Sequence, residues 1–292
     1  MSSFSIARAC VALAGAAAVL ASHAEEAGLA QRRAWIAAVA AQTDDASSEA
    51  FLASFDLSLG EDTWLSLGAG RSRSAESAGD VVADSLRVGV DHRFGKIGIS
   101  FDAERWGDAG AFESTDFGAA VYVQSERLRV GLGRERRAID IEFGVLGALD
   151  RTLTRTAGVD ADGTRFDLRL QVARRWQVHA SATEYDYSRN VAALPRIEQL
   201  NLLSASALTL AHSMVEKRAA VGFEWEAGNQ LLSLVYGRDR SAVDASRFTT
   251  LDGAILFPVA RRIDLEISLG KSRSELVGSG MHGGVLVLIY GR

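Results

Sequence analysis

Apolar and polar residues alternate one by one along most of the chain from residue 51 onward. In each alternating segment, one set of alternate positions, called here a parity, holds apolar residues, and the other parity holds mainly Gly, Ser and charged residues. Examples are the segments 51–59, 97–104, 219–225 and 263–270. A period of two residues is that of a β-strand, whose successive side chains point to opposite faces of a sheet. The pattern therefore predicts an all-β chain whose strands have one apolar and one polar face.

The length of these segments and the content of their polar face distinguish two architectures. A soluble sandwich buries the apolar face, whereas a membrane barrel turns it toward lipid and keeps polar residues inside. The segments run for about 10 residues, which a tilted strand needs to cross a bilayer, while strands of soluble proteins average about 5–6 residues. The polar face mixes full charges with glycine, as a wet interior does. Both features favour a single antiparallel transmembrane β-barrel.

The composition agrees with a membrane barrel and argues against other classes. The chain has 292 residues, of which 48% are hydrophobic and 24% charged, and its net charge is -5. Neither a disordered chain nor a basic nucleic-acid-binding protein is therefore expected. Only two prolines occur. This suits a membrane barrel, because every backbone N–H group inside a bilayer must donate a hydrogen bond and proline has none. The single cysteine, Cys10, allows no disulfide framework and no cysteine metal cluster.

The first 24 residues predict a cleaved signal peptide. Residues 1–8 are mostly polar with one positive charge, and residues 9–21 are apolar. Ser22-His23-Ala24 then places small residues where a signal peptidase cuts. We therefore expect residues 1–24 to be removed and residues 25–292 to form the exported barrel domain.

The chain resembles a Gram-negative outer-membrane β-barrel of the porin type in its alternating segments and its signal peptide. The resemblance covers residues 25–292 and rests on pattern and length, without a motif of a particular subfamily. It implies an outer-membrane location, contact with outer-membrane lipid and lipopolysaccharide, and insertion by the barrel-assembly machinery. In that family the last strand usually ends on an aromatic residue, whereas here Tyr290 lies two residues before the end.

Turn signals set the expected number of strands. Short turns fall near residues 60, 95, 125, 174, 228 and 260, and longer polar stretches separate the other segments. In such barrels the short turns face the periplasm. An even count of about 16 strands results if 151–157 is a weak strand and 200–212 is mostly loop or helix, and the count is 14 if one hairpin is misread. Asp160-Ala161-Asp162-Gly163 is expected to be a polar hairpin turn. Residues 200–212 can be a strand, a loop or a helix.

The polar parity predicts which charged side chains line the interior. Acidic and basic residues both occur on it, so we expect a polar lumen with a transverse field and assign no preference for anions or cations. The expected lumen-lining residues are Arg87, Asp91, Asp102, Glu104, Arg129, Asp140, Glu142, Arg165, Asp167, Arg169, His179, Arg218, Glu224, Asp264 and Glu266.

Cationic residues continue the apolar parity at one end of several strands. A short motif repeats there, as in Leu67-Gly68-Ala69-Gly70-Arg71, Tyr236-Gly237-Arg238 and Leu269-Gly270-Lys271. These cations should point outward above the lipid band, where they either pair with lipopolysaccharide phosphates or act as ordinary solubilising charges. The expected rim residues are Arg71, Arg73, Arg105, Arg134, Arg136, Arg238, Arg240, Lys271 and Arg273.

The expected function is a passive pore for small polar solutes. Two alternatives remain open, namely a structural or docking barrel of an envelope secretion or polysaccharide system, and an outer-membrane lipid hydrolase that uses His179. His179 shares a strand face with Ser181, but the chain lacks a nucleophile elbow, an HExxH motif, a phosphate loop and zinc-ligand spacing. We therefore expect no cofactor, no metal site and no nucleic-acid partner.

Overall fold

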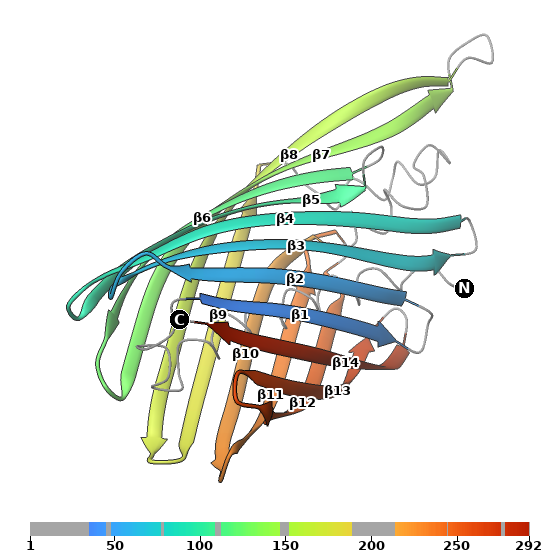
Figure 1. Ribbon diagram of the computed structural model, residues 1–292. Coiled ribbons are helices and arrows are strands. Elements are labelled where there is room, and N and C mark those ends of the chain that lie inside the picture. The colour runs from blue at the N-terminus through green and yellow to red at the C-terminus, as the bar shows by residue number, and fades with distance from the viewer. Residues whose placement is uncertain are drawn as a thin grey trace.

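The described part of the chain forms a single closed antiparallel barrel of 14 strands (Figure 1). A computed structural model describes residues 35–44, 48–76, 79–108, 112–146, 152–188, 214–243, 245–275 and 278–291. The expected signal peptide, residues 1–24, and the ambiguous segment 200–212 lie outside the described residues. Within the described ranges no helix is long and apolar enough to cross a membrane.

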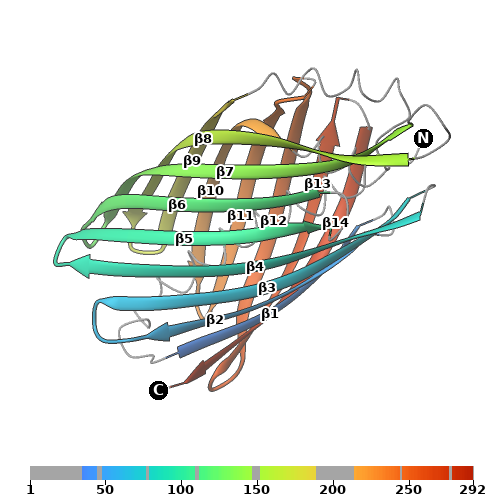
Figure 2. The same cartoon turned by 90° about the horizontal axis from the view of Figure 1, so that it is seen from above.

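Each strand pairs with its neighbours in the sequence, and β1 pairs with β14 to close the barrel. At this closure Ile36 lies opposite Tyr290, and Ala38 lies opposite Leu288. Figure 2 shows the cylinder from above, with β4 to β7 on one side and β11 to β14 on the other. The strands are β1 (Trp35–Asp44), β2 (Ser48–Ser58), β3 (Thr63–Glu76), β4 (Gly79–Phe94), β5 (Ile97–Asp108), β6 (Phe112–Gln124), β7 (Leu128–Leu146), β8 (Thr152–Ala173), β9 (Trp176–Tyr187), β10 (Val215–Ala227), β11 (Gln230–Ser241), β12 (Arg247–Ala260), β13 (Ile263–Ser274) and β14 (Gly278–Gly291).

The expected count of 16 strands is wrong, and the alternative of 14 is confirmed. The difference arises in β8, a single strand of 22 residues that includes residues 152–157 of the expected weak strand and the expected turn at residues 160–163. Asp160-Ala161-Asp162-Gly163 lies within β8 and not at a turn, with Asp162 opposite Arg136. Opposite charges on paired strands stabilise a ladder. The β7–β8 hairpin projects beyond the other strands at one end of the barrel (Figure 1).

Short turns connect the strands at the end of the barrel where β1 begins and β14 ends. Gly95 and Gly228 begin two of these turns with φ angles of 65° and 67°. Glycine adopts positive φ without a steric penalty, and such turns match the twist of the strands that they join. The turns near residues 95 and 228 are therefore those that the sequence predicts.

The outer surface carries most of the exposed apolar residues. Leu86 and Leu269, for example, are 66% and 63% exposed. Close to the short turns, Trp176 packs against Phe223 and Trp225, with ring centres 4.6 Å and 5.4 Å apart. An apolar outer band with aromatic residues at its edge is the surface of a membrane-spanning barrel. The strands thus turn their apolar face outward and leave the opposite face for the interior.

Candidate functional site

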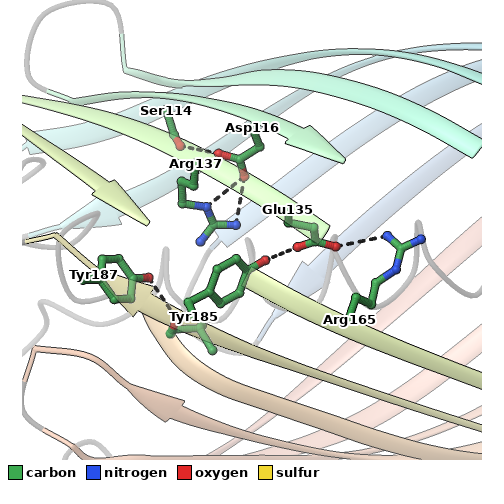
Figure 3. A network of polar contacts seen from close by, with 8 residues as sticks. Ser114, Asp116, Glu135, Arg137, Arg165, Tyr185 and Tyr187 are labelled. Carbon is green, nitrogen blue, oxygen red and sulfur yellow. Dashed lines mark hydrogen bonds and ion pairs between the residues drawn. The ribbon is translucent and has the colours of Figure 1, made fainter. Parts of the chain in front are cut away.

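A network of charged and aromatic side chains crosses the inner face of β6, β7, β8 and β9 (Figure 3). Arg137 of β7 pairs with Asp116 of β6, with Nη2 and Oδ2 2.8 Å apart, and their side chains are 14% and 20% exposed. The Ser114 hydroxyl donates to the same carboxylate at 2.6 Å. Removing one partner of a buried pair is costly, because the other charge stays desolvated without compensation. Arg137 and Asp116 therefore stabilise each other on the inner face of the barrel.

Glu135 of β7 connects two further strands of this network. Its carboxylate accepts a hydrogen bond from Arg165 Nη1 of β8 at 3.0 Å and another from the Tyr185 hydroxyl of β9. Arg165 Nε also donates to Asp167 at 2.9 Å. The Arg137 guanidinium lies 4.7 Å from the centre of the Tyr185 ring, within the range of a cation–π contact. Charges of both signs are thus held in place on three adjacent strands.

A second group of the same composition lies nearer the short turns. The Tyr122 hydroxyl of β6 donates to Asp91 of β4 at 2.7 Å. Arg129 of β7 lies 3.8 Å from the centre of the Tyr122 ring and 3.9 Å from the Asp91 carboxylate. Tyrosine supplies both a donor and a ring face here. We call the inner face of β4 to β10, which carries both groups, the polar wall.

Glycine on a neighbouring strand makes room for each of these tyrosines. A Cβ added to Gly163 would lie 2.7 Å from the Tyr185 ring, and one added to Gly98 would collide with the Tyr122 ring. Glycine inside a strand commonly marks such a close approach of another group. The glycines on the polar parity therefore serve the network by letting aromatic rings lie flat against the wall.

All but two of the expected lumen-lining residues lie on the less exposed inner face. The structure brings several of them to partners: Arg218 Nε lies 3.2 Å from Asp239 Oδ2, and His179 Nδ1 lies 3.6 Å from Glu224 Oε1. Their role in lining a pore stays a prediction. The residues on the inner face are Arg87, Asp91, Asp102, Glu104, Arg129, Arg165, Asp167, Arg169, His179, Arg218, Glu224, Asp264 and Glu266.

The inward placement of Asp140 is wrong. Because β7 continues without a break from Leu128 to Leu146, Asp140 shares the parity of the outward-facing Leu132 and is exposed. Its neighbours Ile139 and Ile141 face inward instead and are 2% and 1% exposed. Glu142 has the same parity as Asp140, but its side chain lies outside those that the structure describes.

Sequence reasoning missed several members of the polar wall, including Asp116, Glu135, Arg137 and Tyr185. Glu135 and Arg137 have the parity of the expected lumen residue Arg129 in a continuous β7, but only the structure shows that the strand continues this far. For Tyr185 the available signal is an aromatic residue on the polar parity, opposite a glycine of the next strand. That signal requires the register between strands, which the sequence alone does not show.

Another part of the inner face is apolar. β1 and β14 bring together five buried residues that are 2–8% exposed, and we call them the seam cluster. Trp64 of β3 and Leu256 of β12 pack against this cluster. Residues 285–289 are apolar on both parities, so the alternation of the other strands stops here. The seam cluster consists of Ile36, Ala38, Leu286, Leu288 and Tyr290.

Two of the expected lumen carboxylates border the seam cluster. Glu266 of β13 is 9% exposed and lies opposite Leu256 on one side and Leu286 on the other. Asp264, on the same strand, accepts a hydrogen bond from the Tyr290 hydroxyl. These two acids therefore have apolar neighbours on the inner face of the barrel, whereas acids of the polar wall such as Asp116 and Glu135 have arginine neighbours.

Comparison with known proteins identifies the fold. No family model matches the chain, and no curated protein matches it significantly. Among solved structures, the CymD monoaromatic hydrocarbon channel matches over 88% of this chain and 87% of that chain, with a TM-score of 0.51 and 10% identity. The fold is that of an outer-membrane β-barrel. The match specifies no subfamily.

Two further solved structures are similar to this barrel at lower TM-scores. A loop L8 deletion mutant of OmpT, an outer membrane protein of Vibrio cholerae, has a TM-score of 0.48 and 9% identity over 88% of this chain and 98% of that chain. A Pseudomonas aeruginosa FadL homologue has a TM-score of 0.47 and 9% identity over 88% of both chains.

All nine expected rim cations are exposed on the outer face of the barrel. Several of them have partners there: Arg71 lies 2.6 Å from Asp84, Arg105 lies 2.6 Å from Glu113, and Arg134 donates to the hydroxyl of Thr164 at 2.5 Å. Part of the positive charge of the rim is thus neutralised by neighbouring strands. Their contact with lipopolysaccharide stays a prediction.

The histidine considered for hydrolysis lies in the polar wall. His179 has Arg169 opposite it on β8 and Gly222 opposite it on β10, and Glu224 is close to its ring. Ser181 lies on the same face, opposite Asp167. In the described part of the chain, no group of three or more His, Cys, Asp or Glu residues is arranged to hold a metal ion.

Proposed function

We propose that this protein is a passive channel of the Gram-negative outer membrane for small polar solutes. In this proposal residues 1–24 direct export and are removed, and the barrel-assembly machinery inserts the remaining chain. The observation that carries the proposal is a charged, hydrogen-bonded inner wall in a closed barrel whose outer face is apolar. Such a division suits an aqueous path through lipid.

The polar wall supplies a mechanism for passage. A barrel of 14 strands encloses more space than the eight-stranded barrels that their own side chains fill. Arg137, Glu135 and Arg165 present fixed charges of alternating sign across neighbouring strands. A polar solute can exchange part of its hydration shell for these groups, and the fixed dipoles orient it during passage.

The charge of the inner face favours cations over anions. In the described part of the chain, every inward-facing arginine lies on β4 to β10, and several of them have a carboxylate partner, as Arg137 has Asp116 of β6 and Arg218 has Asp239 of β11. The inner face of β12 and β13 adds Asp252, Asp264 and Glu266 without any described inward-facing arginine or lysine. A lumen with surplus carboxylates concentrates cations.

Single-channel recording in planar lipid bilayers tests the proposal. The purified protein, shown to be folded by heat-dependent migration on a gel, should produce stepwise openings in potassium chloride. With a salt gradient, the reversal potential should indicate that potassium is more permeant than chloride. A folded barrel that gives no openings would contradict the channel and favour a docking barrel. Openings with a preference for chloride would contradict only the selectivity.

A further inference from the structure

The rim cations divide into two sectors that differ in charge balance. On β3 to β6 the cations stand next to acids on the adjoining strand, with Arg71 paired to Asp84 and Arg105 to Glu113 at 2.6 Å each. On β10, Lys217 lies 2.5 Å from Glu184 of β9. These exposed pairs neutralise one another, so this part of the outer face has little positive charge left for a ligand.

The outer face of β11, β12 and β13 carries a denser group of cations. Arg238 and Arg273 both lie opposite Thr249, one on each side of it, and Lys271 lies opposite Leu251 on the next outward-facing pair. Paired strands are about 4.8 Å apart, so the backbones of Arg238 and Arg273 are about 10 Å apart. This spacing lets two long cationic side chains reach a single phosphate group between them.

Three cations of this sector have no carboxylate partner among the described residues. Glu216 lies 3.3 Å from Arg240, and Glu275 accepts a hydrogen bond from the backbone N–H of Arg247 at 3.0 Å. Among the described residues, no carboxylate pairs with the side chains of Arg238, Lys271 or Arg273, all of which are exposed. We call these three residues and Thr249 the basic patch.

Apolar side chains continue directly from the basic patch along the same outer face. Tyr236, Leu251 and Leu269 lie on the side of the patch that faces the middle of the barrel, and they are 45%, 48% and 63% exposed. A ligand on this surface would therefore meet cations at one end and lipid-facing apolar residues at the other. This is the order of groups in a membrane lipid with a phosphorylated head.

We propose that the basic patch binds a phosphate of lipid A, the lipid part of lipopolysaccharide, with its acyl chains against Tyr236, Leu251 and Leu269. This inference rests on the proposed outer-membrane location. The patch lies at the end of the barrel opposite the short turns, which is the outer leaflet side when those turns face the periplasm. Guanidinium groups bind phosphate through two donors at once, and the lysine adds a point charge.

Two variants with the same loss of charge test the site. R238Q/K271Q/R273Q removes the unmatched cations of the patch, and R71Q/R105Q/K217Q removes two arginines and one lysine that have carboxylate partners. Each basic residue at a membrane surface contributes about a fourfold to sixfold gain in binding, so the patch variant should retain at least about tenfold less lipopolysaccharide. The control variant should retain within about twofold of the unaltered protein.

The measurement is the lipopolysaccharide bound per folded barrel after extraction in mild detergent, followed by titration with purified lipopolysaccharide. Equal losses in the two variants, or no loss in the patch variant, would overturn the proposed site. If the patch variant does not fold, the unaltered protein is titrated with intact and with dephosphorylated lipid A, and equal affinities would overturn the proposal. Conductance of the same samples keeps the two proposals apart: a conducting barrel without the binding difference refutes only the lipid site.

Discussion

The polar wall and the seam cluster occupy the same inner face of one barrel but follow different physical rules. In the polar wall, Glu135 and Arg137 each contact groups on two other strands, so position is set by hydrogen bonds and charge. In the seam cluster, Leu286 and Leu288 pack against Ile36 and Ala38 where the ends of the chain meet. Closure of the barrel thus relies on apolar packing, whereas the route for solutes relies on fixed charge.

This difference shows that inward-facing side chains do not all have the same environment in this barrel. The same carboxylate group has arginine beside it in the polar wall and leucine beside it near the seam, as Glu135 and Glu266 illustrate. The same kind of substitution should therefore change stability by different amounts in the two regions.

A new carboxylate should disrupt the seam far more than the polar wall. Leu288→Asp would place a charge between Ala38 and Asp264 of the adjoining strands and should cost about 3–5 kcal/mol of unfolding free energy or prevent refolding. Thr183→Asp places the same group between Arg165 and Arg218 of the adjoining strands and should change stability by less than about 1 kcal/mol. Urea titration of refolding into lipid vesicles measures both. Similar losses for the two variants would refute the contrast.

Loss of one buried partner in the polar wall should have the next largest effect. Arg137→Gln leaves Asp116 desolvated and should cost about 2–3 kcal/mol, of which Asp116→Asn in the same chain should restore a part. The exposed pair of Arg71 and Asp84 is the matched control, since their side chains are 68% and 59% exposed. Arg71→Gln should therefore cause no measurable loss of unfolding free energy. The unfolding free energies of the single and double variants are compared. If the costs of the two substitutions simply add in the double variant, Arg137 and Asp116 are not energetically coupled.

A methyl group added under an aromatic ring of the polar wall should have a smaller effect. Gly163→Ala forces the Tyr185 ring away from Glu135, because the new Cβ would lie 2.7 Å from it, and should cost about 1–2 kcal/mol. At Gly253 the closest atoms to a new Cβ are 3.9 Å away, so Gly253→Ala should be nearly neutral. Denaturation midpoints compare the two, and an equal cost at Gly253 would show that strand propensity, not the ring, sets the penalty.

Removal of the carboxylates near the seam should change selectivity more than stability. D252N/D264N/E266Q should lower the permeability ratio of potassium to chloride by roughly twofold or more, because the inner face loses three carboxylates. D116N/R137Q removes one charge of each sign from the polar wall and should leave that ratio nearly unchanged. Reversal potentials under a salt gradient measure both variants. An unchanged ratio in the triple variant would place the selective charges elsewhere.

Much of the inner face could be predicted from parity, and the failures have a common cause. Asp91, Asp102 and Glu224 were placed correctly on the inner face because each lies in a strand whose alternation is unbroken. Asp140 was misplaced because its apolar neighbours Ile139 and Ile141 face inward in a continuous β7, opposite to the usual outward orientation of apolar residues. A strand continues or ends according to whether a partner strand continues beside it, and β8 supplies that partner.

The sequence by itself determined that this chain forms alternating membrane-spanning strands, and on most strands which side chains face lipid. That information is local, because backbone geometry turns successive side chains to opposite faces whatever the partner strand is. Only the tertiary structure decided the count of 14, the length of β7 and β8, the tyrosine contacts and the apolar seam. These depend on register between distant segments, which sets the groups that meet across the wall.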